Sequence, residues 1–196
     1  MIEAARQEFQ ANGYAATCMS DVAQRAGVST KTMYRLIPTK AELFKSVVSD
    51  RIRHFMLEVD ADAVDALPLT EALEHMLIAY GTLTLNEETI AMNRLVYGEL
   101  DRFPEIAATF FEVAVRRTSE AMAGWLRHQC ERGLIKLEDA YAAAGMLRGM
   151  MIMEPLRAVM LGQQAIPDPE EIAARAKNCA RLFLDGCRLE HPSEAS

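Results

Sequence analysis

Residues 19–45 read MSDVAQRAGVSTKTMYRLIPTKAELFK, a pattern of two short helices joined by a tight glycine turn. Ala23, Gly27, Val28 and Met33 supply a small residue, a turn glycine and apolar positions, which allow two short helices to cross steeply and still pack. Pro38 ends the second helix, because proline has no backbone N–H with which to continue it. The spacing predicts a helix-turn-helix.

The second of these helices begins with residues that suit an anionic partner. Ser29 can accept hydrogen bonds from the exposed amides of the first turn, so that the positive end of the helix dipole faces outward. In such a motif the N-terminal residues of the second helix reach base edges in the major groove. We predict DNA contacts, with Lys40 on a backbone phosphate, from Thr17, Ser29, Thr30, Lys31, Thr32, Tyr34, Arg35 and Lys40. The alternative is an ordinary pair of surface helices with polar exposed faces.

A longer stretch, residues 4–44, resembles the N-terminal domain of the tetracycline-repressor (TetR) family of one-component transcription regulators. A helix ending in Phe and a Gly-Tyr pair precede the motif in that family, matched here by Phe9 and by Gly13 and Tyr14. The family pattern VSxxTxYxxF-x-x-KxxLF is matched at Val28, Ser29, Thr32, Tyr34, Lys40, Leu43 and Phe44. The resemblance implies a DNA-binding head and an effector pocket in the body. Residues 94–114 also resemble the C-terminal domain of the subset of these regulators linked to efflux and stress genes.

Two positions depart from the family pattern. Ile37 stands where an aromatic residue is usual but still fills an apolar slot, and Cys18 stands where Ser or Thr normally caps the first helix of the motif. A thiol is a poor hydrogen-bond acceptor, so we expect this helix end to be less well capped, by roughly 0.5–2 kcal/mol. An oxidant-sensing role for Cys18 beside the DNA stays open.

The distribution of charge favours DNA binding by the head alone. The chain has a net charge of −7, which by itself would oppose binding to phosphate. Residues 1–55 have a net charge of +3 and residues 56–196 one of −10. We expect a basic head on an acidic body that discourages nonspecific coating of DNA. The alternative is a chance segregation of solvated charges.

The sequence predicts neither a membrane span nor an export signal. It starts with the amphipathic stretch MIEAARQEF, and no run of 18 apolar residues follows. We therefore expect no membrane span and a cytoplasmic location.

Hydrophobic periodicity predicts an all-α fold. Apolar residues recur at helical spacing in every long segment, and no strand of period two is evident. We expect a helix-turn-helix DNA-binding domain over 1–46, a larger helical effector-binding and dimerisation domain over 47–189, and a tail over 190–196. Gly13, Gly27 and Pro38 end the first three helices, and the later ones cover about 40–64, 69–86, 87–101, 104–133, 138–162 and 170–189.

The body of the chain is rich in methionine, whose flexible thioether suits a pocket that adapts to varied apolar ligands. Pro155 frees a backbone carbonyl inside the 138–162 helix, which can provide a polar contact there. We predict effector contacts from Met76, Tyr80, Met92, Phe111, Met122, Trp125, Met146, Met150 and Met153. The alternative is that these side chains simply fill the core.

The last helix carries a wide apolar face and has few neighbours along the chain, so we expect a second subunit to cover it. The face consists of Ile172, Ala176, Cys179, Phe183 and Cys187. Small residues such as Gly145 and Gly149 on the preceding helix would allow a four-helix interface in a homodimer. The alternative is burial of this face inside the monomer.

Other chemistry is not indicated. The four histidines are scattered without a Cys or a second His at metal-ligand spacing, so we expect no metal site. No catalytic grouping or phosphate-cradling glycine loop occurs, and we expect neither catalytic residues nor a cofactor. The four cysteines are expected to be reduced thiols.

These patterns together indicate a ligand-responsive regulator rather than an enzyme. We expect a homodimeric repressor that releases a palindromic double-stranded DNA operator when a small apolar or amphipathic effector binds. One alternative is a helical apolar-ligand carrier or enzyme whose N-terminal motif is only structural. Another is an activator or DNA-architectural protein.

Overall fold

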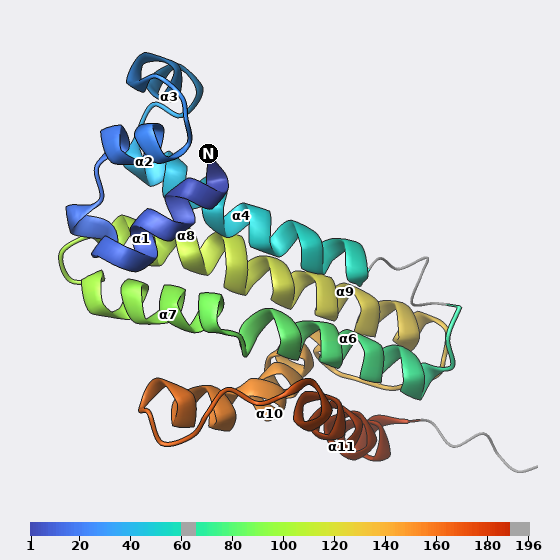
Figure 1. Cartoon of the computed structure of the whole chain (residues 1–196). Coiled ribbons are helices and arrows are strands. Elements are labelled where there is room, and N and C mark those ends of the chain that lie inside the picture. Colours follow the sequence, from blue (N-terminus) through green and yellow to red (C-terminus); the bar gives the residue numbers. More distant parts are fainter. Residues whose placement is uncertain (60–65, 189–196) are drawn as a thin grey trace, which may run out of the picture. The chain divides into compact units, whose positions relative to one another are not determined.

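The computed structural model describes residues 1–59 and 66–188, and every regular element in these ranges is a helix (Figure 1). The all-α prediction is therefore confirmed. The packing divides the chain into two compact units, which are described separately below. The first unit contains Met1–His54 and Glu87–Arg117, and the second contains Phe55–Asn86 and Thr118–Ser196. The predicted tail over 190–196 lies outside the described residues.

The first unit contains the head and the middle of the chain. Its helices are α1 (Ile2–Ala16), α2 (Met19–Arg25), α3 (Thr30–Leu36), the first part of α4 (Lys40–Glu58), α7 (Glu87–Glu99), α8 (Pro104–Phe110) and the π-helical segment η1 (Phe111–Arg116). Pro104 stands in the first turn of α8, where its missing N–H costs nothing. The π-helical segment was not anticipated by the sequence analysis.

An aromatic cluster forms the centre of the first unit. The Phe9 and Tyr14 rings stack with centroids 5.7 Å apart, and the Phe44 ring stands edge-on to both at 5.8 Å. The Phe103 ring adds a further edge contact to Tyr14 at 5.1 Å. Such pairs add about 0.5–1.5 kcal/mol each beyond the burial of their area. Because these rings come from α1, α4 and the start of α8, they fix α1 and α4 against each other beneath the motif.

Glycine conformations produce the predicted breaks in the head. Gly13 has φ +75° and interrupts α1 with non-helical geometry, and Gly27 has φ +68° in the turn between α2 and α3. L-residues with a side chain rarely adopt such values. The chain after Gly13 re-enters helical geometry as far as Ala16, so the predicted helix end is a kink within α1.

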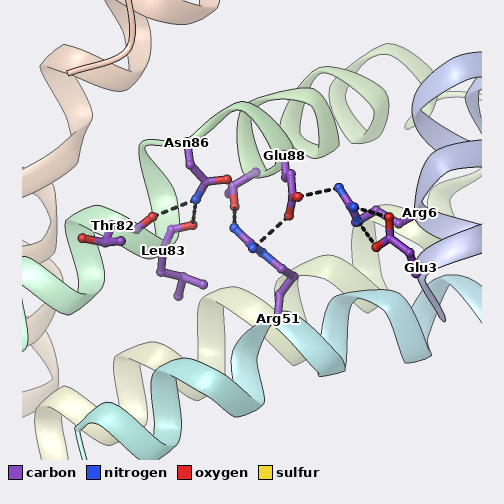
Figure 2. A network of polar contacts seen from close by, with 8 residues as sticks. Glu3, Arg6, Arg51, Thr82, Leu83, Asn86 and Glu88 are labelled. Carbon is purple, nitrogen blue, oxygen red and sulfur yellow. Dashed lines mark hydrogen bonds and ion pairs between the residues drawn. The ribbon is translucent and has the colours of Figure 1, made fainter. Parts of the chain in front are cut away.

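An ion-pair network joins three helices of the first unit (Figure 2). Arg6 of α1 and Arg51 of α4 approach Glu88 of α7 from two sides, with N–O distances of 2.5 and 2.8 Å. Arg6 also pairs with Glu3. These residues line a cleft of about 570 Å³. Because α7 thus packs with α1, residues 87–117 belong to the same packing unit as the head, which the expected boundary at residue 46 does not anticipate.

The second unit contains α6 (Leu69–Thr84), α9 (Arg117–Glu131), α10 (Ala140–Met160) and α11 (Pro169–Cys187), where Arg117 itself is counted with the first unit. The bounds of α6, α10 and α11 lie within a few residues of the expected helices, and α9 is the last part of the expected 104–133 helix, after α8 and η1. Asp168 caps α11, with its side chain on the Glu171 amide and the Glu171 side chain on the Asp168 amide. Asn86 closes the end of α6 by donating to the carbonyls of Thr82 and Leu83 (Figure 2).

Gly81 allows α6 to pack closely against α10 and α11. A Cβ atom at this position would lie 2.6 Å from Met151 Cε and 2.8 Å from Ile172 Cγ2, closer than van der Waals contact permits. The space at Gly145 and Gly149 is open, with no atom within 4 Å of an added Cβ. Gly81 of α6 is therefore the small residue that allows the close helix packing. Gly145 and Gly149 of α10 face open space in this chain.

Pro155 leaves the carbonyl of Met151 without its helical partner, as the sequence predicts. The expectation that this carbonyl serves a pocket is corrected, because Arg175 of α11 occupies it. Arg175 Nε donates to Met151 O at 2.7 Å and its Nη2 donates to Met150 O at 2.9 Å. The guanidinium thus supplies hydrogen bonds to the carbonyl oxygens of Met150 and Met151 and links α11 to α10.

Gly81→Ala is expected to lower the free energy of unfolding by about 1–3 kcal/mol, measured by urea denaturation. The added methyl group must displace Met151 and the stiff, β-branched Ile172, and this strain outweighs the gain of about 0.5–1 kcal/mol in helix propensity.

Gly124→Ala is the matched control, because its methyl group would meet only the end of the Arg127 side chain at 3.8 Å. Its stability should hold or rise by up to about 1 kcal/mol. A Gly81→Ala variant as stable as the wild type would show that the close packing imposes no constraint.

Candidate nucleic-acid interface and effector site

The motif helix α3 presents an accessible, capped N-terminus. Ser29 Oγ accepts a hydrogen bond from the Thr32 amide at 3.1 Å, as its expected capping role requires. The turn before it is closed by the Val28 amide, which donates to Ala23 O at 3.0 Å. This bond and the positive φ of Gly27 set the crossing of α2 and α3.

Most of the predicted DNA-contacting side chains lie together on α3. The exposed side chains are those of Thr30, Lys31, Tyr34 and Arg35. Thr32 is half-buried, and its hydroxyl oxygen lies 2.9 Å from the hydroxyl oxygen of Ser29. The Tyr34 side chain is 49% exposed, so its phenol is accessible to a partner. This surface offers hydroxyl, phenol, ammonium and guanidinium donors from one helix, the set that phosphate and base edges need.

Lys40 has a structural position rather than a surface one. Its Nζ donates to the carbonyls of Tyr14, Ala15 and Thr17 at 2.7, 3.0 and 3.1 Å, and it lies 4.7 Å above the Tyr14 ring. An ammonium group has three N–H donors, so all of them are used within the chain. The expectation that Lys40 holds a DNA phosphate is corrected, since the free carbonyls at the end of α1 attract it first.

Thr17 is also turned inward. Its side chain is buried, and its hydroxyl donates to Gly13 O at 2.7 Å and to Glu8 O at 3.1 Å. The hydroxyl thereby joins the end of α1 to two of its own backbone carbonyls. The structure therefore does not place Thr17 among the exposed residues of α3.

An ion pair that the sequence analysis missed fixes α2 on α1. Glu8 is buried, and its carboxylate accepts from Arg25 Nε at 2.6 Å and from Asn12 Nδ2 at 2.7 Å. A buried carboxylate is costly unless such partners are present. The sequence indicates that Glu8 is buried only through its position on the inward face of α1. Its partner Arg25 lies 17 residues later and could not be inferred from helical spacing.

Cys18 stands at the N-cap of α2 without a side-chain capping bond, as expected. Its exposed thiol lies 3.6 Å from Ala16 O instead. The nearby Asp21 carboxylate contacts the Ser20 hydroxyl at 3.2 Å. The α2 end therefore lacks the side-chain acceptor that Ser29 gives to α3.

The predicted effector residues do not form one group. Met76, Tyr80, Met122 and Trp125 lie in the core of the second unit, and Met150 packs against it. Met146 and Met153 are 70% and 53% exposed, because α10 turns Leu147 and Met151 inward instead. Met92 packs against the core of the first unit and Phe111 is exposed there, so these two belong to a different unit from the other predicted effector residues.

A charged residue that the sequence analysis did not select lies beside Tyr80. Arg148 Nε donates to the Tyr80 hydroxyl at 3.1 Å, its Nη1 donates to Ser119 Oγ, and its guanidinium carbon lies 5.2 Å from the centre of the Tyr80 ring. Burial raises the pKa of the Tyr80 phenol, and this effect outweighs the lowering by Arg148. The phenol therefore stays protonated at neutral pH.

The apolar stripe of α11 is covered within the chain. Ile172, Ala176 and Cys179 are buried in the second-unit core that α6 shares, and Phe183 and Cys187 are half-buried against it. The expectation that this face needs another subunit is corrected by this packing. Burial also raises the pKa values of the Cys179 and Cys187 thiols. The large apolar side chains left exposed on and beside α10 and α11 are Tyr141, Met146, Met153, Leu161 and Leu182.

Within residues 1–59 and 66–188, no group of three or more His, Cys, Asp or Glu side chains is arranged to hold a metal ion. The helices of the same ranges are all too short or too polar to cross a membrane.

The sequence and the fold were compared with known protein families and solved structures. Residues 1–47 match the bacterial regulatory proteins of the tetR family, and residues 71–186 match the C-terminal domain of AefR-like transcriptional repressors. A structure of a putative TetR-family regulator from Mesorhizobium loti is 26% identical, with 96% of this chain and 95% of that chain covered and a TM-score of 0.84. No curated protein sequence matches.

Two further structures share the fold. The flavonoid-responsive regulator FrrA is 25% identical over 97% of this chain and 96% of its own, with a TM-score of 0.75. FadR from Bacillus subtilis, solved in complex with stearoyl-CoA, is 22% identical over 94% of this chain and 96% of its own, with a TM-score of 0.72.

A capped helix-turn-helix on a helical body that matches repressor domains defines a DNA-binding transcriptional regulator. The chain belongs to the TetR family.

Cys18→Ser is expected to raise the stability of the head by up to about 1 kcal/mol, because a hydroxyl at this N-cap can accept an amide hydrogen bond of α2 that the thiol does not. Thermal melts under reducing conditions measure the change.

Cys18→Ala serves as the control, since it removes the thiol without adding an acceptor. Melts and DNA binding compared before and after peroxide treatment separate capping from oxidant sensing, because only a sensor loses its peroxide response on replacement by Ser. A Ser variant that melts earlier than the reduced wild type would contradict the capping argument.

Proposed function

We propose that this regulator is a homodimeric repressor that binds a palindromic operator through α3 and releases it when a small amphipathic effector binds the second unit. The observation that carries the proposal is the grouping of exposed hydroxyl and cationic donors on the capped helix α3. We further propose that it acts in the cytoplasm, where its operator is. The match to AefR-like repressor domains supports a repressing role.

A helix as short as α3 reads few base pairs, so specific binding favours two copies on two half-sites. Operators of this kind are palindromic because the protein pair has two-fold symmetry. The α3 donors divide by expected task. Lys31 and Arg35 supply charge for phosphates and base edges, and Tyr34 and Thr30 supply neutral hydroxyls.

The second unit has the features of an effector site. Its core is apolar, with Met76, Met122 and Trp125 all buried, and such a core suits the apolar part of a ligand. The effector can release DNA only if it binds the conformation with low DNA affinity better than the one with high DNA affinity. The relatives FrrA and FadR are described as flavonoid-responsive and as bound to stearoyl-CoA, which supports an effector with a large apolar part.

The exposed apolar side chains of α10 and α11 are the proposed dimer surface. Met146, Met153 and Leu182 are each more than half exposed, a combination that costs free energy in water. The open space at Gly145 and Gly149 would allow a helix of the partner to come close. This surface replaces the buried stripe of Ile172, Ala176 and Cys179 in the proposal.

Lys31→Ala and Tyr34→Ala are each expected to weaken operator binding by about 1–3 kcal/mol, measured by fluorescence anisotropy with the DNA upstream of the chain's own gene. Both side chains are exposed, so the fold should be unaffected.

Lys177→Ala on α11 is the charge-matched control, because it removes an exposed lysine far along the chain from the motif. Equal affinities for the wild type, the two α3 variants and Lys177→Ala would refute DNA reading by α3 and favour a carrier or an enzyme.

Leu182→Glu is expected to convert the dimer to monomers in light scattering, because it places a charge in the proposed apolar interface. Operator binding at low protein concentration should fall with it.

Lys177→Glu on the same helix provides the control, since it places the same side chain at an exposed polar position and changes the net charge by two units instead of one. A Leu182→Glu variant that stays dimeric while Lys177→Glu behaves like the wild type would place the interface elsewhere.

A further inference from the structure

Arg148 is a charged group held by neutral partners inside the second unit. Its described contacts are the Tyr80 hydroxyl, the Tyr80 ring and the Ser119 hydroxyl. In the described ranges 1–59 and 66–188, no carboxylate pairs with it. Arg148 is half-buried, and its remaining N–H groups are not among the buried donors without a partner, so they are accessible to solvent or to a ligand.

The remaining hydrogen-bonding capacity around Arg148 consists of donors. A guanidinium has five N–H groups, and two are used by Tyr80 and Ser119, which leaves three without an acceptor in the described part of the chain. The Tyr80 hydroxyl accepts from Arg148, and its own proton has no acceptor there either. The matching ligand group must therefore accept several hydrogen bonds and carry negative charge.

A second unfilled donor belongs to the same core. The indole Nε1 of Trp125 is buried and has no hydrogen-bond partner in the part of the chain that the structure describes. Buried N–H groups without partners are rare in folded proteins. Around these polar atoms the core consists of apolar side chains such as Met76, Met122 and Leu126.

We propose that Arg148, together with Tyr80, binds the carboxylate of an effector whose remaining part is apolar. Arg148 presents a fork of N–H donors that pairs with both oxygens of a carboxylate, and Tyr80 adds an O–H donor beside it. The apolar part of the same molecule contacts the surrounding apolar side chains. This inference rests on the proposed function, because it names the chemical class of the effector.

The test uses the full-length protein with octanoate, dodecanoate and 4-butylbenzoate, each compared with the corresponding neutral alcohol. Binding is followed by the fluorescence of Trp125, the single tryptophan of the chain, and by thermal melts. We expect the carboxylates to bind the wild type and to raise its melting temperature more than the alcohols do.

Arg148→Met keeps the length and the apolar stem but removes the charge. It should weaken carboxylate binding by about 10- to 100-fold and leave the binding of the alcohols unchanged. Arg148→Lys keeps the charge without the fork and should recover part of the affinity. Arg157→Met, an exposed arginine on the same helix, is the control and should bind like the wild type.

The melting temperature of the ligand-free variants tests the same point without a ligand. If the guanidinium is held for an anion, ligand-free Arg148→Met should be as stable as the wild type or more stable. A clear loss of stability, together with no carboxylate-selective binding, would assign Arg148 a purely structural role and overturn the proposal.

Operator binding separates failure of this inference from failure of the proposed function. Wild-type protein that binds operator DNA but shows no preference for any of the three carboxylates over its alcohol overturns the carboxylate site and leaves the repressor intact. Protein that binds carboxylates selectively but not DNA supports the site and refutes the repressor.

Discussion

Three hydrogen bonds from the Lys40 ammonium group hold the DNA-reading motif closed at its base. They run to the carbonyls of Tyr14, Ala15 and Thr17, where α1 ends, and Lys40 is the first residue of α4. The chain between these points forms α2, the turn and α3. The favourable energy of these bonds offsets part of the conformational entropy that closing and ordering this loop costs. The aromatic contacts of Phe9 and Phe44 act on the same pair of helices.

The second unit depends on a close packing that requires compensation elsewhere. Gly81 brings α6 against α10 and α11, and Pro155 opens the backbone ladder of α10 at Met151. Arg175 fills the vacated position from α11, so that one guanidinium replaces the missing amide and links two helices. The apolar stripe of α11 packs against α6 and the rest of the second-unit core, so it is buried within a single chain.

Periodic and terminal signals made the helices predictable from the sequence. Gly13, Gly27, Pro38 and Pro104 act on their own backbone, so their effects need no knowledge of the fold. The partners of Lys40 and of Arg25 are 17 to 26 residues away and depend on how the helices pack, which the sequence does not specify. The sequence likewise does not specify which methionine side chains are buried, because their burial also depends on how the helices pack. Composition indicated that α10 is rich in it, but only the packing decided that Met151 points inward and Met146 outward.

The arginines inside the two units differ in how their charge is compensated, and that difference is informative. Arg25 pairs with Glu8, Arg6 and Arg51 share Glu88, and Arg175 takes two carbonyls and reaches Glu154 at 3.3 Å. Each of these arginines joins two helices through carboxylate or carbonyl oxygens, and the Glu8 carboxylate among them is buried. Arg148 connects α10 to α6 and α9 through hydroxyls that a water molecule could equally satisfy, so architecture alone does not explain its positive charge. The donors that remain on Arg148 are best explained by what they bind, and a half-buried positive charge beside an apolar core selects for an anion with an apolar body.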